Sequence, residues 1–224
     1  MSKISQGKKG EDKVISLLKK EKLYHKVINN ATYVVGKTLM SHQIDHILIH
    51  PHGVFVIETK NYYGDINAQT YDSFWLKTIK GKTEKIANPL KQNKSHTIIV
   101  NNLLNKKYEV IPVVVFVRNN APYFDDENVI NLKDLHLFID SYPYQKELNK
   151  EEINLIYKIL KEKETKITKK EHLENIEYLK QFRRESQLEM AYAIEKRICP
   201  RCNHEMVVKD NEFFCSHCDY KFKL

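Results

Sequence analysis

Apolar residues at helical spacing mark the start of the chain and several later segments. Within residues 10–21, Val14, Leu17 and Leu18 share one helical face in an otherwise charged segment. Pro89 is a residue favoured in the first turn of a helix, and the apolar residues of 95–104 extend that helix. Helical patterns are also predicted at residues 132–142, 151–162 and 168–197.

Runs of β-branched and other apolar residues predict the strands. Residues 44–50 and 54–60 form two such runs, and the segment His50-Pro51-His52-Gly53 has proline and glycine placed for a tight turn, which predicts a hairpin. Three further strand segments are predicted, at residues 33–35, in a second hairpin at 73–86 that turns at Lys80-Gly81-Lys82, and in the apolar run 110–117 typical of a buried central strand. This order predicts an α/β sandwich around a central mixed sheet.

The first hairpin brings three charged side chains together. Side chains at i and i+2 of a strand share a face, so Glu58 and Lys60 point the same way. If the turn has two residues, His50 pairs with Gly53 and the register places Asp45 opposite Glu58. Opposed residues have Cβ atoms roughly 4.5 to 5.5 Å apart. Two carboxylates at that distance repel unless a positive charge lies between them.

Mg²⁺ fits such a pair, because it takes oxygen ligands and often uses one or two carboxylates plus water and substrate phosphate. Beside it, Lys60 could position or deprotonate an attacking water and neutralise charge on a phosphorane. The pattern therefore indicates a nuclease site. The alternative is that Asp45 and Glu58 are ordinary exposed positions on a half-solvated hairpin.

Four segments follow one another along the first part of the chain: Gly7-Lys8-Lys9-Gly10-Glu11, Gln43-Ile44-Asp45-His46, Gly53-Val54-Phe55-Val56-Ile57-Glu58-Thr59-Lys60-Asn61 and Asn88-Pro89-Leu90-Lys91-Gln92-Asn93. In this order they resemble the nuclease-related domain (NERD) family, a branch of the restriction-endonuclease-like, PD-(D/E)xK superfamily. The resemblance extends over roughly the first 130 residues. It departs from the superfamily name in having Ile44 where a proline is expected.

The resemblance implies a restriction-endonuclease-like fold with Asp45 and Glu58 as ligands of Mg²⁺ or Mn²⁺ and Lys60 as the catalytic lysine. It also implies that Glu11 is an additional acidic residue of the site and that Gln92 lies close to the lysine. Otherwise, Glu11 is an acid favoured near a helix N-terminus and Gln92 is a solvated helix position.

All four cysteines lie near the end of the chain, as Cys199-Pro200-Arg201-Cys202 and Cys215-Ser216-His217-Cys218 with twelve residues between the pairs. Two such pairs can surround one Zn²⁺ tetrahedrally with four thiolates. The alternatives are two disulfides or a redox pair, but residues 1–10 are polar and basic, so we expect no export to an oxidising compartment. We predict a closed structural zinc ribbon, with His204 and His217 outside the ligand set.

This ribbon resembles the four-cysteine fingers that follow bacterial type IA topoisomerases. Between the cysteine pairs, apolar residues flank a polar segment, which predicts a hairpin. Tyr220, Phe222 and Phe213 could stack on bases of a single strand, or they could form the small core of the ribbon. We expect Phe213 to be core.

The net charge of +8 is concentrated in the half of the chain that carries the nuclease-like segments. The first hundred residues hold sixteen lysines and eight acidic residues, whereas the rest of the chain is balanced. Surface lysines bind phosphates without reading sequence. Candidate contacts are the lysines of the first helix and of the second hairpin: Lys8, Lys9, Lys13, Lys80 and Lys82. Any one of them is also explained by solvation alone.

Four histidines lie on or near the first hairpin: His42, His46, His50 and His52. Strand alternation places His46 and His50 on the face opposite Asp45. We therefore expect these two histidines not to join the carboxylates of the nuclease-like site.

These patterns predict a nuclease-like domain at 1–145, a helical extension at 146–197 and a zinc ribbon at 198–224. We expect a cytoplasmic, metal-dependent deoxyribonuclease that acts on DNA rather than RNA and has no membrane partner. The alternative is a catalytically inactive nucleic-acid-binding or adaptor module. The helix at 168–197 could be an arm or a dimerisation surface, so a homodimer or a larger DNA-processing complex stays open.

Overall fold

The computed structural model describes residues 3–35, 40–68, 74–122, 128–167, 169–199, 201–202, 204–209, 212–218 and 220–223. The chain divides into two compact units, Met1–Ile167 and Thr168–Leu224. In chain order the first unit contains α1 (Lys3–Leu18), β1 (Lys26–Val35), β2 (Met40–His50), β3 (Gly53–Lys60), β4 (Asp65–Asn67), β5 (Phe74–Ile79), β6 (Lys82–Ala87), α2 (Pro89–Leu103), β7 (Val110–Phe116), β8 (Val129–Asn131), η1 (Leu132–Asp134), α3 (Leu135–Ser141) and α4 (Lys150–Glu162).

A five-stranded mixed sheet forms the centre of the first unit, in the order β1-β2-β3-β7-β8. Strands β1, β2 and β3 are antiparallel neighbours, whereas β7 runs parallel to both β3 and β8. This arrangement confirms the predicted mixed α/β class. The parallel step from β3 to β7 is made through α2, the crossover that parallel strands require.

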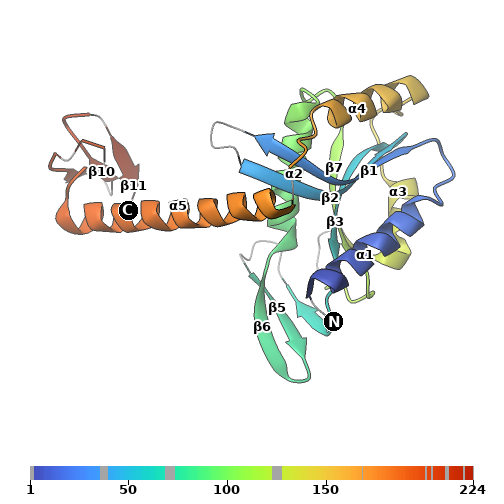
Figure 1. Cartoon of the computed structure of the whole chain (residues 1–224), viewed down its shortest axis with the longest axis horizontal. Helices are drawn as coiled ribbons and strands as arrows, with labels where there is room; N and C mark the ends of the chain where they lie inside the picture. The colour runs from blue at the N-terminus through green and yellow to red at the C-terminus, as the bar shows by residue number, and fades with distance from the viewer. Residues whose placement is uncertain are drawn as a thin grey trace. The chain divides into compact units, whose positions relative to one another are not determined.

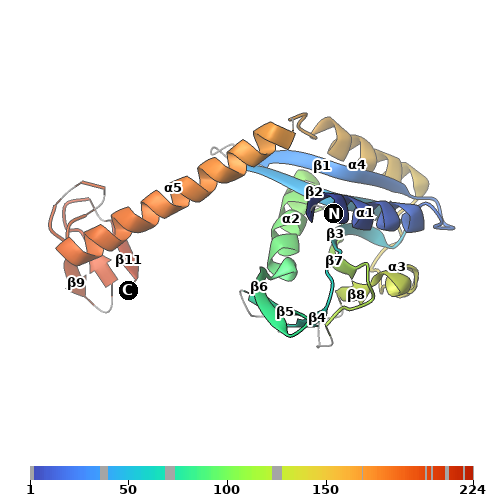
Figure 2. The same ribbon diagram turned by 60° about the horizontal axis from the view of Figure 1, so that its bottom comes forward.

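Helices cover both faces of this sheet (Figures 1 and 2). On one face, Val54 and Val56 of β3 pack with buried residues of α2 and α4. On the other, Phe55 and Ile57 pack with Val14 of α1 and with buried residues of α3. Because alternate residues of β3 enter both layers, this strand is buried along nearly its whole length.

The first hairpin has the register predicted from its turn. His50 pairs with Gly53, and the ladder continues from there to His46 opposite Ile57. Gly53 has φ +137, and a Cβ added there would lie 2.6 Å from Ile111 Cδ1. The turn therefore requires glycine for both backbone conformation and space.

A second, smaller sheet has the order β4-β5-β6. The predicted second hairpin is present as β5 and β6, and it turns at Lys80 and Gly81, which both have positive φ. Figures 1 and 2 show it extending from the body of the first unit. Trp75 anchors this hairpin, because it is fully buried and stacks on Phe116 of the central sheet.

Several predicted boundaries were wrong. Helix α1 spans Lys3–Leu18 rather than residues 10–21, β1 begins at Lys26 rather than at residue 33, and β2 begins at Met40 rather than at residue 44. The first turn of α1 has few apolar residues, and a polar pair at Asn29 and Asn30 interrupts the strand pattern of β1. Pairing with β2, rather than local periodicity, sets the extent of β1, and a hydrogen bond from Gln6 to the Asn61 carbonyl ties the first turn of α1 to the residue after β3.

The second unit contains α5 (Lys169–Lys196), β9 (Val207–Lys209), β10 (Glu212–Phe214) and β11 (Lys221–Lys223). The long helix and the hairpin between the cysteine pairs were both predicted, and β11 adds a third antiparallel strand. Phe213 is buried with Met206 and the cysteines, which confirms it as core. Among the described residues, no helix is long and apolar enough to cross a membrane.

Candidate active site

Lys60, the last residue of β3, links this strand to helix α2. Its Nζ donates to Glu58 Oε1 at 2.5 Å and to Gln92 Oε1 of α2 at 3.1 Å. The Glu58 and Lys60 side chains are only 4% and 12% exposed. An ion pair at this depth is weakly screened, so each charge depends on the other.

Asp45 of β2 lies beside this pair. Its Oδ2 accepts a hydrogen bond of 2.8 Å from the backbone N–H of Thr59, which fixes the carboxylate next to the end of β3. Burial and the charge of Glu58 raise the pKa of Asp45 to about 8. The predicted repulsion between these two carboxylates is therefore present in the structure.

The charges of Glu58 and Lys60 support each other. Burial alone would raise the pKa of Glu58, but the Lys60 ammonium and His96 outweigh it and hold that pKa below its ordinary value. Burial alone would lower the pKa of Lys60, but Glu58 outweighs it and raises that pKa. Without a metal, the site at neutral pH thus holds an ionised Glu58–Lys60 pair and a protonated Asp45.

Helix α2 contributes one residue that the sequence analysis missed. His96 lies one turn after Gln92, is buried, and places its Nδ1 3.5 Å from Glu58 Oε2. The spacing of four residues puts both side chains on one face of α2. That spacing was a signal available in the sequence, because Gln92 was already a candidate.

Buried asparagines fix the position of α2. Asn88 caps the helix, its Oδ1 accepting from the Leu90 N–H at 2.9 Å. Asn93 is fully buried, and its Nδ2 donates to the carbonyls of Val56 at 2.9 Å and Val113 at 3.0 Å. These bonds tie the helix to neighbouring strands β3 and β7, so Gln92 and His96 face the end of β3.

Helix α1 brings Glu11 near the site. Gln6 Nε2 donates to the Asn61 carbonyl and Asn61 Nδ2 donates to the Gln6 carbonyl, each at 2.7 Å. Gly10 lies against Asn61, and the charge of Glu11 adds to the forces that raise the pKa of Asp45. The structure thus brings Glu11 within electrostatic reach of the carboxylates.

Gly10→Ala is expected to displace α1 from the end of β3. The added Cβ would lie 2.8 Å from Asn61 Cβ, a contact that requires helix or strand to move. We expect a loss of about 1–3 kcal/mol in the free energy of unfolding, measured by urea denaturation. Gly7→Ala is the matched control, since a Cβ there meets nothing within 4 Å, and equal losses in both variants would contradict the prediction.

A cleft of about 680 Å³ opens beside Lys60. Its walls come from α1, from the end of β3 and from the β5–β6 hairpin, and they include Gln6, Gly7, Lys60, Tyr63 and Lys85. Lys60 is therefore one of the residues that line an open cleft on this side of the first unit.

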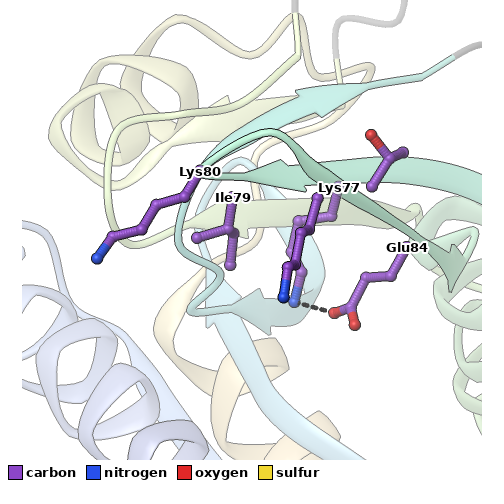
Figure 3. A pocket seen from close by; sticks show the side chains of 6 residues that line it. Lys77, Ile79, Lys80 and Glu84 are labelled. Atoms are coloured by element: carbon purple, nitrogen blue, oxygen red, sulfur yellow. Dashed lines mark ion pairs between the residues drawn. The ribbon is translucent and has the colours of Figure 1, made fainter.

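The predicted basic residues are exposed on two of the elements that contribute to this cleft. Lys8, Lys9 and Lys13 are exposed on α1, and Lys80 and Lys82 are exposed at the tip of the hairpin. A second hollow of about 480 Å³ lies on the hairpin itself. Figure 3 shows Lys77 paired with Glu84 across the hairpin, while the Lys80 side chain extends away from that pair.

The carboxylates have the donor set of a divalent-cation site. Glu58 Oε2 is buried and makes no hydrogen bond among the described residues, although His96 Nδ1 lies 3.5 Å away. Burial and the charge of Glu58 raise the pKa of the neighbouring Asp45 and so keep it protonated. A bound cation would lower that pKa again and favour the ionised carboxylate. Asp45 and Glu58 therefore offer carboxylate oxygens that could hold a divalent cation such as Mg²⁺ or Mn²⁺.

The four cysteines of the second unit converge as predicted. Cys199 Sγ lies 3.6 Å from Cys218 Sγ, Cys202 Sγ lies 3.5 Å from Cys215 Sγ, and all four sulfur atoms are within 4.8 Å of one another. Four thiolates around zinc have sulfur atoms about 3.8 Å apart for Zn–S bonds of about 2.3 Å. The cluster could therefore hold one zinc ion.

The hairpin histidines divide among different partners. His46 Nδ1 lies 2.8 Å from Asn29 Oδ1, and burial lowers the pKa of His46 to about 4, so its ring is neutral. His42 meets the edge of the His96 ring at 6.0 Å. His50 lies at the far end of β2, with Glu21 and Asp140.

Comparison with known proteins agrees with this geometry. The nuclease-related domain family matches residues 6–117, the span from the first turn of α1 to the end of β7. An uncharacterized protein of Bacillus anthracis is 32% identical over 160 residues, which cover 68% of this chain and 74% of that protein. No solved structure matches. The chain belongs to the nuclease-related domain family.

Proposed function

We propose that this protein is a metal-dependent nuclease that hydrolyses phosphodiester bonds of DNA, with a site of the PD-(D/E)xK type. One observation carries the proposal: the Lys60 ammonium lies on the wall of a basic cleft, paired to a buried carboxylate whose second oxygen has no hydrogen-bond partner among the described residues. A surface that only binds DNA gains nothing from paired carboxylates facing a polyanion.

Each residue has a distinct role in this proposal. Asp45 and Glu58 hold Mg²⁺ or Mn²⁺, which when bound polarises the scissile phosphate and lowers the pKa of a water ligand. Lys60 orients the attacking water and neutralises charge that develops on the phosphate. Gln92 holds the lysine, since its Oε1 accepts from Nζ at 3.1 Å. Glu11 acts at longer range, through the charge it presents to Asp45.

The cleft accounts for how a nucleic acid would reach the site. Lys77 and Lys85 of the hairpin line the groove, and further exposed lysines lie on α1, whose first turns also line it, so a bound phosphate backbone would meet positive charge from both elements. The ribbon is proposed to bind one structural zinc and to provide an accessory contact with the nucleic acid.

Cleavage assays test the proposal directly. Labelled single-stranded, double-stranded and flapped DNA, and RNA of matched sequence, would be incubated with Mg²⁺ or Mn²⁺, with EDTA as the blank. We expect metal-dependent cutting of DNA that Glu58→Ala and Lys60→Ala abolish at matched folding. Lys85→Ala, in the same cleft, is expected to weaken binding while keeping turnover at saturating substrate.

Two outcomes would contradict the proposal. If the wild-type protein cuts nothing, or if cutting survives both substitutions, the hairpin site is not catalytic. Salt-dependent binding without cutting would then identify an inactive nucleic-acid-binding or adaptor module.

Metal affinity is expected to rise with pH. The metal requires an ionised Asp45, whose pKa is raised to about 8, so protons compete below that pH. The affinity for Mn²⁺ should increase roughly tenfold per pH unit between about pH 6 and that pKa, then level off. Mn²⁺ affinity would be measured by calorimetric titration at several pH values. The wild type and Asp12→Asn should show the same dependence of affinity on pH, whereas Asp45→Asn should lose this dependence.

The raised pKa of Asp45 also makes the stability of the metal-free protein depend on pH. The pKa of Asp45 lies above its ordinary 3.8, so its contribution to stability is fully present below that value and is lost as pH rises through about 8. Thermal melts of the metal-free protein should therefore show a pH-dependent loss that Asp45→Asn removes. A melting temperature that rises between pH 7 and about 9 would contradict this sign.

A further inference from the structure

A second cluster of ligating side chains lies at the opposite end of β2 from Asp45. Glu21 follows α1, His50 is the last residue of β2, and Asp140 lies on α3. One ligand atom from each falls within 4.8 Å of the others. Three segments that are far apart in the sequence thus bring two carboxylates and an imidazole to one place.

The three side chains differ in how deeply they are buried. His50 is fully buried, and its Nε2 has no hydrogen-bond partner among the described residues. The Glu21 side chain is 3% exposed, and one of its oxygens contacts His136 Nδ1. Asp140 is exposed. A buried polar nitrogen without a partner costs free energy of folding, and a ligand bound to His50 Nε2 would offset that cost.

We propose that Glu21, His50 and Asp140 form a zinc site distinct from both the nuclease-like site and the ribbon. A mixed imidazole and carboxylate set suits Zn²⁺ and related divalent transition metals, whereas Mg²⁺ and Ca²⁺ prefer oxygen ligands alone. The contact between His136 and Glu21 would orient the ligating carboxylate, as supporting hydrogen bonds do in many metal sites.

Binding requires two local adjustments. Ligand atoms around tetrahedral zinc lie about 3.4 Å apart, so the exposed Asp140 carboxylate must move inward. The His52 N–H donates to His50 Nδ1 at a long 3.3 Å, and coordination by either ring nitrogen would end that bond, since coordination through Nε2 places a proton on Nδ1. The loss is small beside a metal bond.

The metal would join the segment after α1 to α3 and to the turn of the first hairpin. Strands and helices on this face share one apolar core, which includes Leu18, Phe55 and Ile139. Zinc is therefore expected to stabilise the first unit and to hold α1 on the sheet.

Zinc counting tests the site on the full-length protein. After equilibration at a fixed free Zn²⁺ concentration, wild type should retain about one more zinc per chain than the double variant Glu21→Gln/Asp140→Asn. Glu147→Gln, an exposed acid outside the cluster, should match wild type. The difference should be the same on a Glu58→Gln background, which separates this site from the nuclease-like one.

NMR of the His50 ring gives a second test that does not depend on whether the double variant folds. Adding Zn²⁺ to wild type should shift one ring ¹⁵N resonance of His50, and Asp140→Asn, which changes only an exposed side chain, should weaken that response. Equal zinc content in wild type and the double variant, or His50 resonances that do not respond to Zn²⁺, would overturn the proposal.

Discussion

Lys60→Met is expected to destabilise the metal-free protein by about 3–5 kcal/mol and to lower any cleavage rate by about 10²–10⁴-fold. The substitution leaves the Glu58 carboxylate, whose side chain is 4% exposed, without the ammonium that lies 2.5 Å away. An unpaired buried charge costs more than the pair contributes, so the loss in stability should be large. Urea denaturation in EDTA would measure it.

A double-mutant cycle separates the cost of the unpaired Glu58 charge from the cost of lost packing. Glu58→Gln/Lys60→Met replaces the pair by neutral side chains of similar size and should recover most of the stability, but none of the cleavage. Lys77→Met is the matched control, because Lys77 lines the same cleft but pairs with the half-exposed Glu84, and it should cost only about 0–1 kcal/mol. Equal costs at Lys60 and Lys77 would show that the burial of the pair is unimportant.

Cys215→Ser is expected to unfold the ribbon while leaving the first unit folded. The ribbon core is four cysteines with Met206, Phe213 and Tyr220, too little to fold without a metal whose binding contributes about 10–16 kcal/mol in comparable zinc fingers. In the Co²⁺-substituted protein, the thiolate charge-transfer absorption should be lost. Amide resonances of the ribbon should collapse to unfolded positions, whereas those of the first unit stay.

Histidine variants provide the control for the ribbon. His204 and His217 stack with ring centroids 3.7 Å apart, but the four neighbouring sulfur atoms could by themselves supply the four ligands of a tetrahedral site. His204→Asn and His217→Asn should therefore keep the thiolate absorption. Its loss in either histidine variant, or its survival in Cys215→Ser, would show that the ligand set is different.

Features that depend on short spacings could be predicted from the sequence. The turn at His50 to Gly53 and the alternation of β3 set the hairpin register, because side chains in a strand repeat every two residues. The same reasoning placed Glu58 and Lys60 together. Two Cys-x-x-Cys pairs predicted a cluster, because each pair can bind a metal through its local turn.

The distant side chains that join these local groups depend on how the elements pack in three dimensions. His96 reaches Glu58 because Asn93 binds carbonyls of both β3 and β7, a contact that no periodicity encodes. His50 was correctly separated from Asp45, but strand alternation could not name Glu21 and Asp140 as its neighbours. Those contacts arise where a loop and a short helix pack against the sheet, and such packing depends on the whole core rather than on any local pattern.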